Sequence, residues 1–332
     1  MWVSAVAAIV TLAATPLVRR EMLKRGVIDV PNHRSAHQIP VPRGGGLACG
    51  LGVITGAVIA NALGLHVSWP AIGSGLALAL VGYLDDQHQL PVLPRLASQV
   101  LVGAAIGANL GGPAWGCVGA LLVPIVVNVV NFMDGINGIT ALTMSVWGMV
   151  AMIVGLAQGV VVLASLGALI TGSAMGFLPW NAPHARVFLG DVGSYLFGAL
   201  VATGMLVGAS AGVSPVVLAA PLAVYLADSG ITLGRRLLQR APVFEAHREH
   251  TYQRLVHEFG MPHLVVAGGV SALAAVIAWG WVAMRAGLAV PLTVATLGIF
   301  LVSVPASRAV QTFILRRSGG QPDESSDLSR SA

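Results

Sequence analysis

Long apolar segments, separated by short polar ones, fill this chain of 332 residues from its beginning to about position 310. Most of them hold roughly 18–22 residues, enough for a helix to cross a hydrocarbon layer of about 30 Å. Backbone polar groups cannot stay unpaired in lipid, so such segments fold as helices. The sequence therefore predicts an all-α polytopic membrane protein with 10 or 11 transmembrane helices, forming one domain over residues 1–310. The predicted spans are 1–18, 44–64, 68–84, 96–111, 114–132, 138–157, 159–178, 194–210, 213–232, 263–284 and 287–307.

The composition excludes a soluble globular fold. Charged residues make up 9% of the chain, against about 25% in soluble domains. The two cysteines, Cys49 and Cys117, both lie in apolar segments, so they indicate neither a disulfide framework nor a zinc motif.

Basic residues fix the predicted orientation. Arg19, Arg20, Lys24 and Arg25 follow the first span, and an N-terminus outside the membrane places every Lys and Arg except Arg285 on the inner side. This asymmetry is the positive-inside pattern. The excess of basic residues is therefore explained by membrane topology, and no nucleic-acid partner is expected. The expected location is the bacterial inner membrane, with a periplasmic N-terminus, a cytoplasmic site and a disordered cytoplasmic tail at 311–332.

Acidic residues gather at the predicted inner ends of the spans. Asp85 and Asp86 are adjacent in "VGYLDDQHQL", and Asp134, Asp191 and Asp228 lie at other inner ends. Ionisable groups at membrane depth are costly and therefore candidates for function. The alternatives for each are a solvated helix end or an interhelical pair.

Asparagine and glycine surround these acids. In "NVVNFMDGINGIT" the residues Asn128, Asn131, Asp134 and Asn137 recur every three positions, which on a helix would place them near one stripe. In "FLPWNAPHARVFLGDVGS" the order Asp191, Gly193, Ser194 resembles a helix start whose amides could face an anion.

Oxygen-rich sites of this kind suit a hard cation such as Mg²⁺, which often binds substrate phosphate as well, and arginines suit phosphate oxygens. The histidines of "HREH" leave zinc open as an alternative, but they come without cysteines. The chemistry favoured is Mg²⁺-assisted phosphoryl transfer at the membrane surface. An ion-coupled transporter is the rival class, although it predicts midplane acids in two matching halves.

Four motifs in order resemble the polyprenyl-phosphate N-acetylhexosamine-1-phosphate transferases over about residues 20–260. They are "PNHRSAHQIPVPRGGG", "GYLDDQHQLPVLPRLASQ", "NFMDGINGI" and "FLPWNAPHARVFLGDVGS", and the "HREHTYQRL" loop is most similar to the branch that initiates O-antigen or related surface polysaccharides. The resemblance implies transfer of N-acetylhexosamine 1-phosphate from a UDP-sugar to undecaprenyl phosphate, releasing UMP. It also implies Mg²⁺ as cofactor, with Mn²⁺ as the substitute, and a homodimer as one expected assembly.

The resemblance also implies roles for individual residues. Asp191 matches the metal ligand, Asp85 and Asp86 match the pair that positions the metal or lipid phosphate, and one of these two is a candidate base. The expected catalytic residues are Asp85, Asp86, Asp134 and His250; the metal ligands are Asp191 and Asp85; the substrate-binding residues are Asn131, Asn137, Asn181, Phe188, Arg43, Arg95 and Arg248.

The chain departs from the pattern of this family at three places. Asn137 stands where many members carry a second aspartate, Arg95 stands near a usual lysine, and Tyr252 and Gln253 replace later histidines. The triple-histidine run of the muramoyl-pentapeptide branch is absent, so that peptidoglycan enzyme type is kept only as an alternative. The expected donors are UDP-GlcNAc and 6-deoxy-N-acetylhexosamines such as UDP-FucNAc and UDP-QuiNAc, and no residue selects among them.

Overall fold

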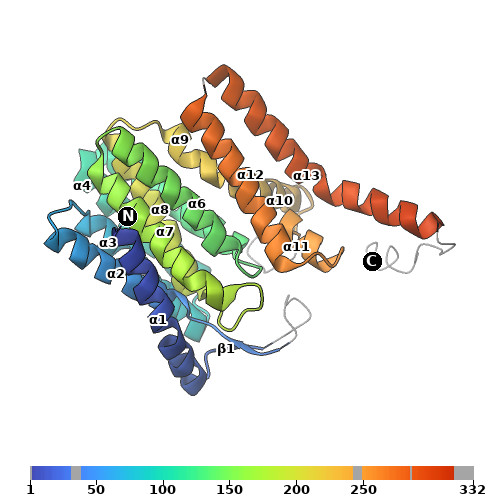
Figure 1. Cartoon of the computed structure of the whole chain (residues 1–332), viewed down its shortest axis with the longest axis horizontal. Helices are drawn as coiled ribbons and strands as arrows, with labels where there is room; N and C mark the ends of the chain where they lie inside the picture. Colours follow the sequence, from blue (N-terminus) through green and yellow to red (C-terminus); the bar gives the residue numbers. More distant parts are fainter. Residues whose placement is uncertain (1, 31–38, 242–248, 285, 318–332) are drawn as a thin grey trace.

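The computed structural model describes residues 2–30, 39–241, 249–284 and 286–317, and it is a bundle of long helices (Figure 1). Every predicted span falls on helical structure, so the all-α polytopic fold is confirmed. The first group comprises α1 (Trp2–Arg25), α2 (Gly46–Ala62), α3 (Trp69–His88), α4 (Val92–Gly111), α5 (Pro113–Met133), α6 (Ile139–Ala157), α7 (Val161–Asn181) and α8 (Gly190–Ser210). The second comprises α9 (Pro215–Ala219), the 3₁₀ turn η1 (Ala220–Leu222), α10 (Ala223–Leu238), α11 (Thr251–His257), α12 (His263–Ala283) and α13 (Ala286–Arg317).

Eight stretches are long and apolar enough to cross a membrane: α1, α5, α6, α7, α8, the α9–η1–α10 stretch, α12 and α13 up to Arg308. The helix α2 is apolar but shorter, with 17 residues. The helices α3 and α4 have 20 residues each but are not among these eight; Asp85 and Asp86 lie in α3, and Arg95 lies in α4. Single helices such as α3 therefore contain both an apolar stretch and part of a polar motif.

Two boundaries differ from the prediction. The predicted span 213–232 is divided by the 3₁₀ turn at Pro221, because proline offers no backbone N–H to continue the helix. The helix α13 continues to Arg317, beyond the predicted domain end at 310. Residues 318–332 of the predicted tail lie outside the described residues.

The helix α8 forms the centre of the bundle. It packs along α3 and α5, and residues Val192–Gly208 are buried without interruption. Small residues allow close pairing elsewhere: a Cβ on Gly103 of α4 would lie 2.1 Å from the carbonyl oxygen of Gly119 in α5. Such contacts are typical of helices that associate in lipid. Large apolar side chains such as Trp2 and Leu101 are exposed on the outside, as a lipid-facing surface requires.

One end of the bundle carries the pair of strands and the short helix α11 (Figure 1). The strands β1 (Ile28–Asp29) and β2 (Val41–Pro42) form an antiparallel pair beside the end of α1. At the same end, Arg19 of α1 donates a hydrogen bond to the carbonyl oxygen of Arg186, and the last turns of α3 and α5 meet the first turns of α4 and α8. The described parts of the four motifs, which for the first are residues 39–46, therefore come together at this end.

Candidate active site

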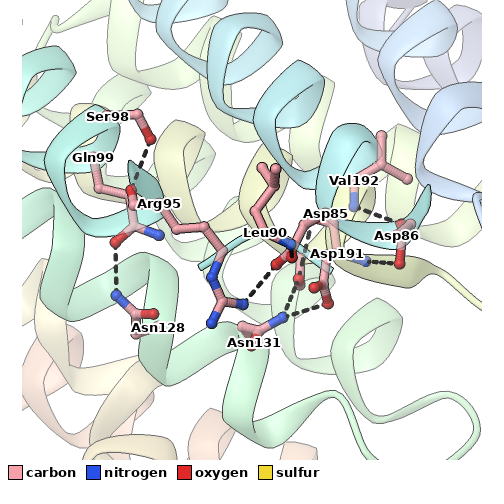
Figure 2. A network of polar contacts seen from close by, with 11 residues as sticks. Asp85, Asp86, Leu90, Arg95, Ser98, Gln99, Asn128, Asn131, Asp191 and Val192 are labelled. Carbon is pink, nitrogen blue, oxygen red and sulfur yellow. Dashed lines mark hydrogen bonds and ion pairs between the residues drawn. The ribbon is translucent and has the colours of Figure 1, made fainter. Parts of the chain in front are cut away.

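Two carboxyl groups from different helices meet at this end of the bundle. Asp85 lies in the last turn of α3 and Asp191 in the first turn of α8, and the two side chains lie within hydrogen-bonding reach of each other. Asp85 is only 5% exposed. Its carboxylate accepts hydrogen bonds from the backbone N–H of Leu90 (2.8 Å) and from the Arg95 guanidinium (2.6 Å). Figure 2 shows this network from close by.

Asp86 acts on the start of α8. Its two carboxylate oxygens accept hydrogen bonds from the backbone N–H groups of Asp191 and Val192, both at 3.1 Å. The sequence predicted that amides at this helix start would face an anion, and the anion is Asp86 itself. A carboxylate at a helix N-terminus satisfies unpaired N–H groups and the helix dipole. Asp86 therefore fixes the backbone that carries Asp191.

Asn131 supplies the third side of the site, from the last turns of α5. Its side-chain nitrogen donates to Asp191 Oδ1 (2.8 Å) and to Ser194 Oγ (3.0 Å). Asn128 lies one turn earlier and donates to Gln99 Oε1 at 2.7 Å. The predicted polar stripe on α5 is thus present for these two asparagines. Ser194 and Gln99 were not among the predicted residues, although each follows a predicted one at helical spacing.

Glycines allow the helices to come this close. A Cβ on Gly82 of α3 would lie 2.2 Å from the carbonyl oxygen of Asp191, so only glycine fits there. Gly190 has φ of +75°, a conformation that favours glycine. The sequence prediction missed Gly82; its signal was a glycine one helical turn before an aspartate pair.

The glycine run 44–46 packs along the "FLGD" motif. The backbone N–H of Gly45 donates to Phe188 O and that of Gly46 to Leu189 O, both at 2.9 Å. The Phe188 side chain is half-buried. Arg43, just before the run, pairs with Asp29 of β1 at 3.0 Å and also interacts electrostatically with Asp86 and Asp191. Arg43 is therefore the second guanidinium near the carboxylates.

Asp134 lies in the turn between α5 and α6. It is half-buried, and the loss of solvent around its carboxyl group raises the pKa of that group to about 7. It interacts electrostatically with Asp86 and Arg43. The turn itself is held by Asn181, whose Oδ1 accepts from the backbone N–H of Gly138 at 2.6 Å.

Two of the predicted substrate-binding residues are engaged with protein groups. Asn181 is buried, and its side-chain nitrogen also donates to Val187 O at 3.2 Å, so it ties two loops together. Asn137 was expected near the α5 stripe, but α5 ends at Met133 and Asn137 instead donates to Pro183 O at 3.0 Å. The stripe does not extend to Asn137 because Gly135 and Gly138 turn the chain away from the helix.

His250 lies beside Asp228 of α10, at the start of α11. Its Nδ1 is 3.5 Å from Asp228 Oδ2, and Asp228 Oδ1 accepts from the backbone N–H of Thr251 at 2.9 Å. Tyr252, missed by the prediction, donates from its hydroxyl to Phe132 O at 2.9 Å, which docks α11 on the end of α5. His250 is buried in this contact. Its catalytic role stays a prediction.

A metal was predicted on Asp191 and Asp85. Among the described residues, no group of three His, Cys, Asp or Glu side chains has the arrangement of a metal site. Two converging carboxylates still fit Mg²⁺, which binds one or two carboxylates and completes its shell with water and substrate phosphate. Arg248, and the residues His33, Arg34, His37 and His247 of the predicted loops, lie outside the described residues.

Comparisons with known proteins match this site. The model of glycosyl transferase family 4 matches residues 68–209, which hold Asp85, Asp86, Asn131, Asp134 and Asp191. The chain is 29% identical over 282 residues to a probable undecaprenyl-phosphate N-acetylglucosaminyl 1-phosphate transferase of Bacillus subtilis, covering 78% of this chain and 77% of the relative.

Two further relatives carry related names. One is a decaprenyl-phosphate N-acetylglucosaminephosphotransferase of Mycobacterium leprae, 28% identical with 82% of this chain and 81% of the relative covered. The other is an undecaprenyl-phosphate alpha-N-acetylglucosaminyl 1-phosphate transferase of Yersinia pestis, 28% identical with 72% of each covered. The helical bundle, the match of the family model over residues 68–209 and these relatives together support a place for the chain in the superfamily of polyprenyl-phosphate N-acetylhexosamine-1-phosphate transferases.

Proposed function

We propose that this protein transfers N-acetylhexosamine 1-phosphate from a UDP-sugar to undecaprenyl phosphate, forming an undecaprenyl-diphosphate sugar and UMP. The observation that carries the proposal is the junction of Asp85 and Asp191 with Asn131 and Arg95, at the end of a membrane bundle. Carboxylates and a guanidinium at such a junction suit a reaction between a lipid phosphate and a nucleotide diphosphate. The names of the relatives, which specify polyprenyl phosphates and N-acetylglucosamine, support the same reaction.

Asp191 and Asp85 would hold Mg²⁺, or Mn²⁺ in its place, and the cation would offset the charge of the donor diphosphate. Asp86 keeps the Asp191 backbone in place through its two hydrogen bonds. Asp85 is held in the same way by Leu90 and Arg95, so the proposed acceptor of the proton from the lipid phosphate is one member of this aspartate pair.

Cationic and amide groups complete the proposed site. Arg43 and Arg95 would face phosphate oxygens, since guanidinium geometry matches them. Phe188 would stack on the uracil ring beside the loop that Asn181 fixes, and Asp134 borders the same space. Arg248 and His250, from the 241–262 segment, would contact the donor sugar.

UDP-GlcNAc is the first donor to test, because the relatives' names specify N-acetylglucosaminyl transfer. UDP-FucNAc and UDP-QuiNAc are the 6-deoxy alternatives, and O-antigen or another surface polysaccharide is the proposed product pathway. The proposed location is the bacterial inner membrane with the site on the cytoplasmic side, as the basic residues indicate.

The experiment uses full-length protein in detergent micelles with undecaprenyl phosphate and a panel of UDP-sugars, and it measures UMP release. We expect turnover with one UDP-N-acetylhexosamine, loss of turnover with EDTA, and recovery with Mg²⁺. Asp191→Asn and Asp85→Asn should each reduce kcat at least about 100-fold, whereas the exposed Asn109→Ala variant should match the wild type. UMP release that ignores EDTA would refute the metal assignment, and no release with any UDP-sugar would refute the proposed reaction.

A phospho-N-acetylmuramoyl-pentapeptide donor belongs in the same panel. A relative with that activity in its name, from Symbiobacterium thermophilum, is 31% identical over 157 residues, although it covers only 47% of this chain and 37% of its own length. Turnover with this donor alone would replace the proposed substrate.

A further inference from the structure

Two buried hydrogen-bond donors on α4 stand next to the carboxylate cluster without an acceptor. They are Nε of Arg95 and the side-chain nitrogen of Gln99, and within the part of the chain that the structure describes neither has a partner. The Gln99 side chain is 0% exposed. A buried donor without an acceptor costs about 1–3 kcal/mol, and in native proteins it usually marks a missing water or ligand. The two donors therefore mark a position where a water or a ligand would supply the acceptor.

The orientation of the Gln99 amide follows from its neighbour. Asn128 donates from its side-chain nitrogen to the carbonyl oxygen of Pro124 at 2.8 Å, and a carbonyl can only accept. The Asn128 group 2.7 Å from Gln99 is the same nitrogen, so Gln99 must present its oxygen to Asn128. Its NH₂ group is consequently turned away from Asn128. Figure 2 shows that nitrogen on the side of the Arg95 guanidinium.

The helix places the two donors together. Arg95 and Gln99 are four residues apart on α4, so their side chains share one face, about one turn apart. Another part of the same guanidinium holds Asp85 at 2.6 Å. The unpaired donors thus border the carboxylate cluster, and Gln99 lies about 6 Å further along the helix axis, away from the loops and towards the lipid.

We infer that Gln99 and Arg95 form a subsite for one phosphate oxygen of the lipid acceptor. Both unpaired groups are donors, which suits an anionic oxygen, and hydrogen bonds to a charged acceptor are the strong ones. Gln99 lies deeper along α4 than Arg95, whereas a soluble nucleotide approaches from the loop side, so the phosphate of a lipid fits this position better than that of a nucleotide. The inference rests on the proposed function, since it takes a polyprenyl phosphate as the acceptor.

The test separates acceptor binding from donor binding. Gln99→Leu keeps the approximate size and removes the donor, and the KM for undecaprenyl phosphate should rise about tenfold, while the KM for the UDP-sugar stays within twofold. Gln99→Glu keeps an oxygen for Asn128 and places a negative charge against the phosphate, so its acceptor KM should rise further. Ser98→Ala is the matched control on the same helix, because that hydroxyl donates only to the backbone of Arg95.

Undecaprenyl phosphate without any donor provides a readout besides activity. It should raise the unfolding temperature of the wild type and the Ser98→Ala variant, and raise it less in Gln99→Leu and Gln99→Glu. An acceptor KM within twofold of the wild type in both Gln99 variants would overturn the subsite and indicate a trapped water instead. Gln99→Glu retains the contact with Asn128, so it keeps the test decisive if Gln99→Leu folds poorly. A wild type that turns over no acceptor would refute the proposed function, which is a distinct result.

Discussion

Replacing Gly82 by alanine tests whether the contact between α3 and α8 positions the carboxylates. The added Cβ would lie 2.2 Å from the carbonyl oxygen of Asp191, 2.5 Å from its carbonyl carbon and 2.7 Å from the nitrogen of Val192. All three are backbone atoms, so no side chain can move aside. Because real Cβ contacts are rarely shorter than 3.0 Å, the two helices must separate by roughly 0.8 Å. This shift lengthens both hydrogen bonds of Asp86 and separates Asp85 from Asp191.

The expected cost falls more on activity than on stability. Overpacking costs about 1–3 kcal/mol, and the better helix propensity of alanine returns up to about 1 kcal/mol, so the net destabilisation is about 0–2 kcal/mol. A displacement of about 1 Å in an active site can reduce the rate about 100-fold. We therefore expect folded Gly82→Ala protein with roughly 1% of the wild-type turnover.

Gly73→Ala is the matched control. It lies on the same helix, is exposed, and nothing lies within 4 Å of its added Cβ. The assay compares UMP release and thermal unfolding in detergent for the two variants and the wild type. Gly82→Ala protein with near wild-type turnover would refute the proposed dependence of the site on this contact. Equal losses in both variants would show a general effect of alanine in α3.

Three further perturbations address the loops around the site. Asn181→Ala strands the N–H of Gly138 and should lower the free energy of unfolding by about 1–3 kcal/mol, measured by thermal unfolding against the neutral control Asn109→Ala; equal stability would contradict the tie. Burial raises the pKa of Asp134 to about 7 from 3.8, so the folded state keeps a proton that the unfolded state loses, and stability should fall as pH rises from about 4 to 7. The Asp134→Asn variant should lose this pH dependence of stability, measured by unfolding scans across the same pH range. An unchanged pH dependence would show that another group causes it. Asp228→Ala removes the oxygen that accepts from the first N–H of α11, whereas Asp228→Asn keeps one. The alanine variant should therefore be less stable by about 1 kcal/mol and unfold at the lower temperature. The reverse order of unfolding temperatures would contradict a capping role for Asp228.

Membrane character and the location of the site could be predicted from the sequence because both depend on local composition. Each apolar segment forms a helix independently of the others in lipid, since its backbone N–H and C=O groups find hydrogen-bond partners only within the segment. The acids mark the ends of these helices because charge is costly deeper in the bilayer. Asp85, Asp191 and Asn131 were accordingly predicted to lie together, and they do.

The partners of the polar residues could not be predicted, since they depend on how the helices pack. Asn137 and Asn131 look alike in the sequence, yet one faces Pro183 and the other Asp191. The two adjacent aspartates also look equivalent. Only the approach of α8 at Gly82 separates them, because it presents two backbone N–H groups to Asp86 and leaves Asp85 to Arg95.

The sequence by itself therefore determined that this chain is a membrane-spanning helical protein with an acidic site at one end of its spans, because hydrophobicity and charge act on each segment separately. The tertiary structure decided which carboxylate holds a helix and which one faces its neighbour across the site. It also decided that Gln99 presents a donor beside Arg95, since Asn128, 29 residues away in the chain, fixes the orientation of that amide. Hydrogen bonds between helices depend on the distance and angle at which the helices approach each other. Neither can be predicted from the identity of one residue in the sequence.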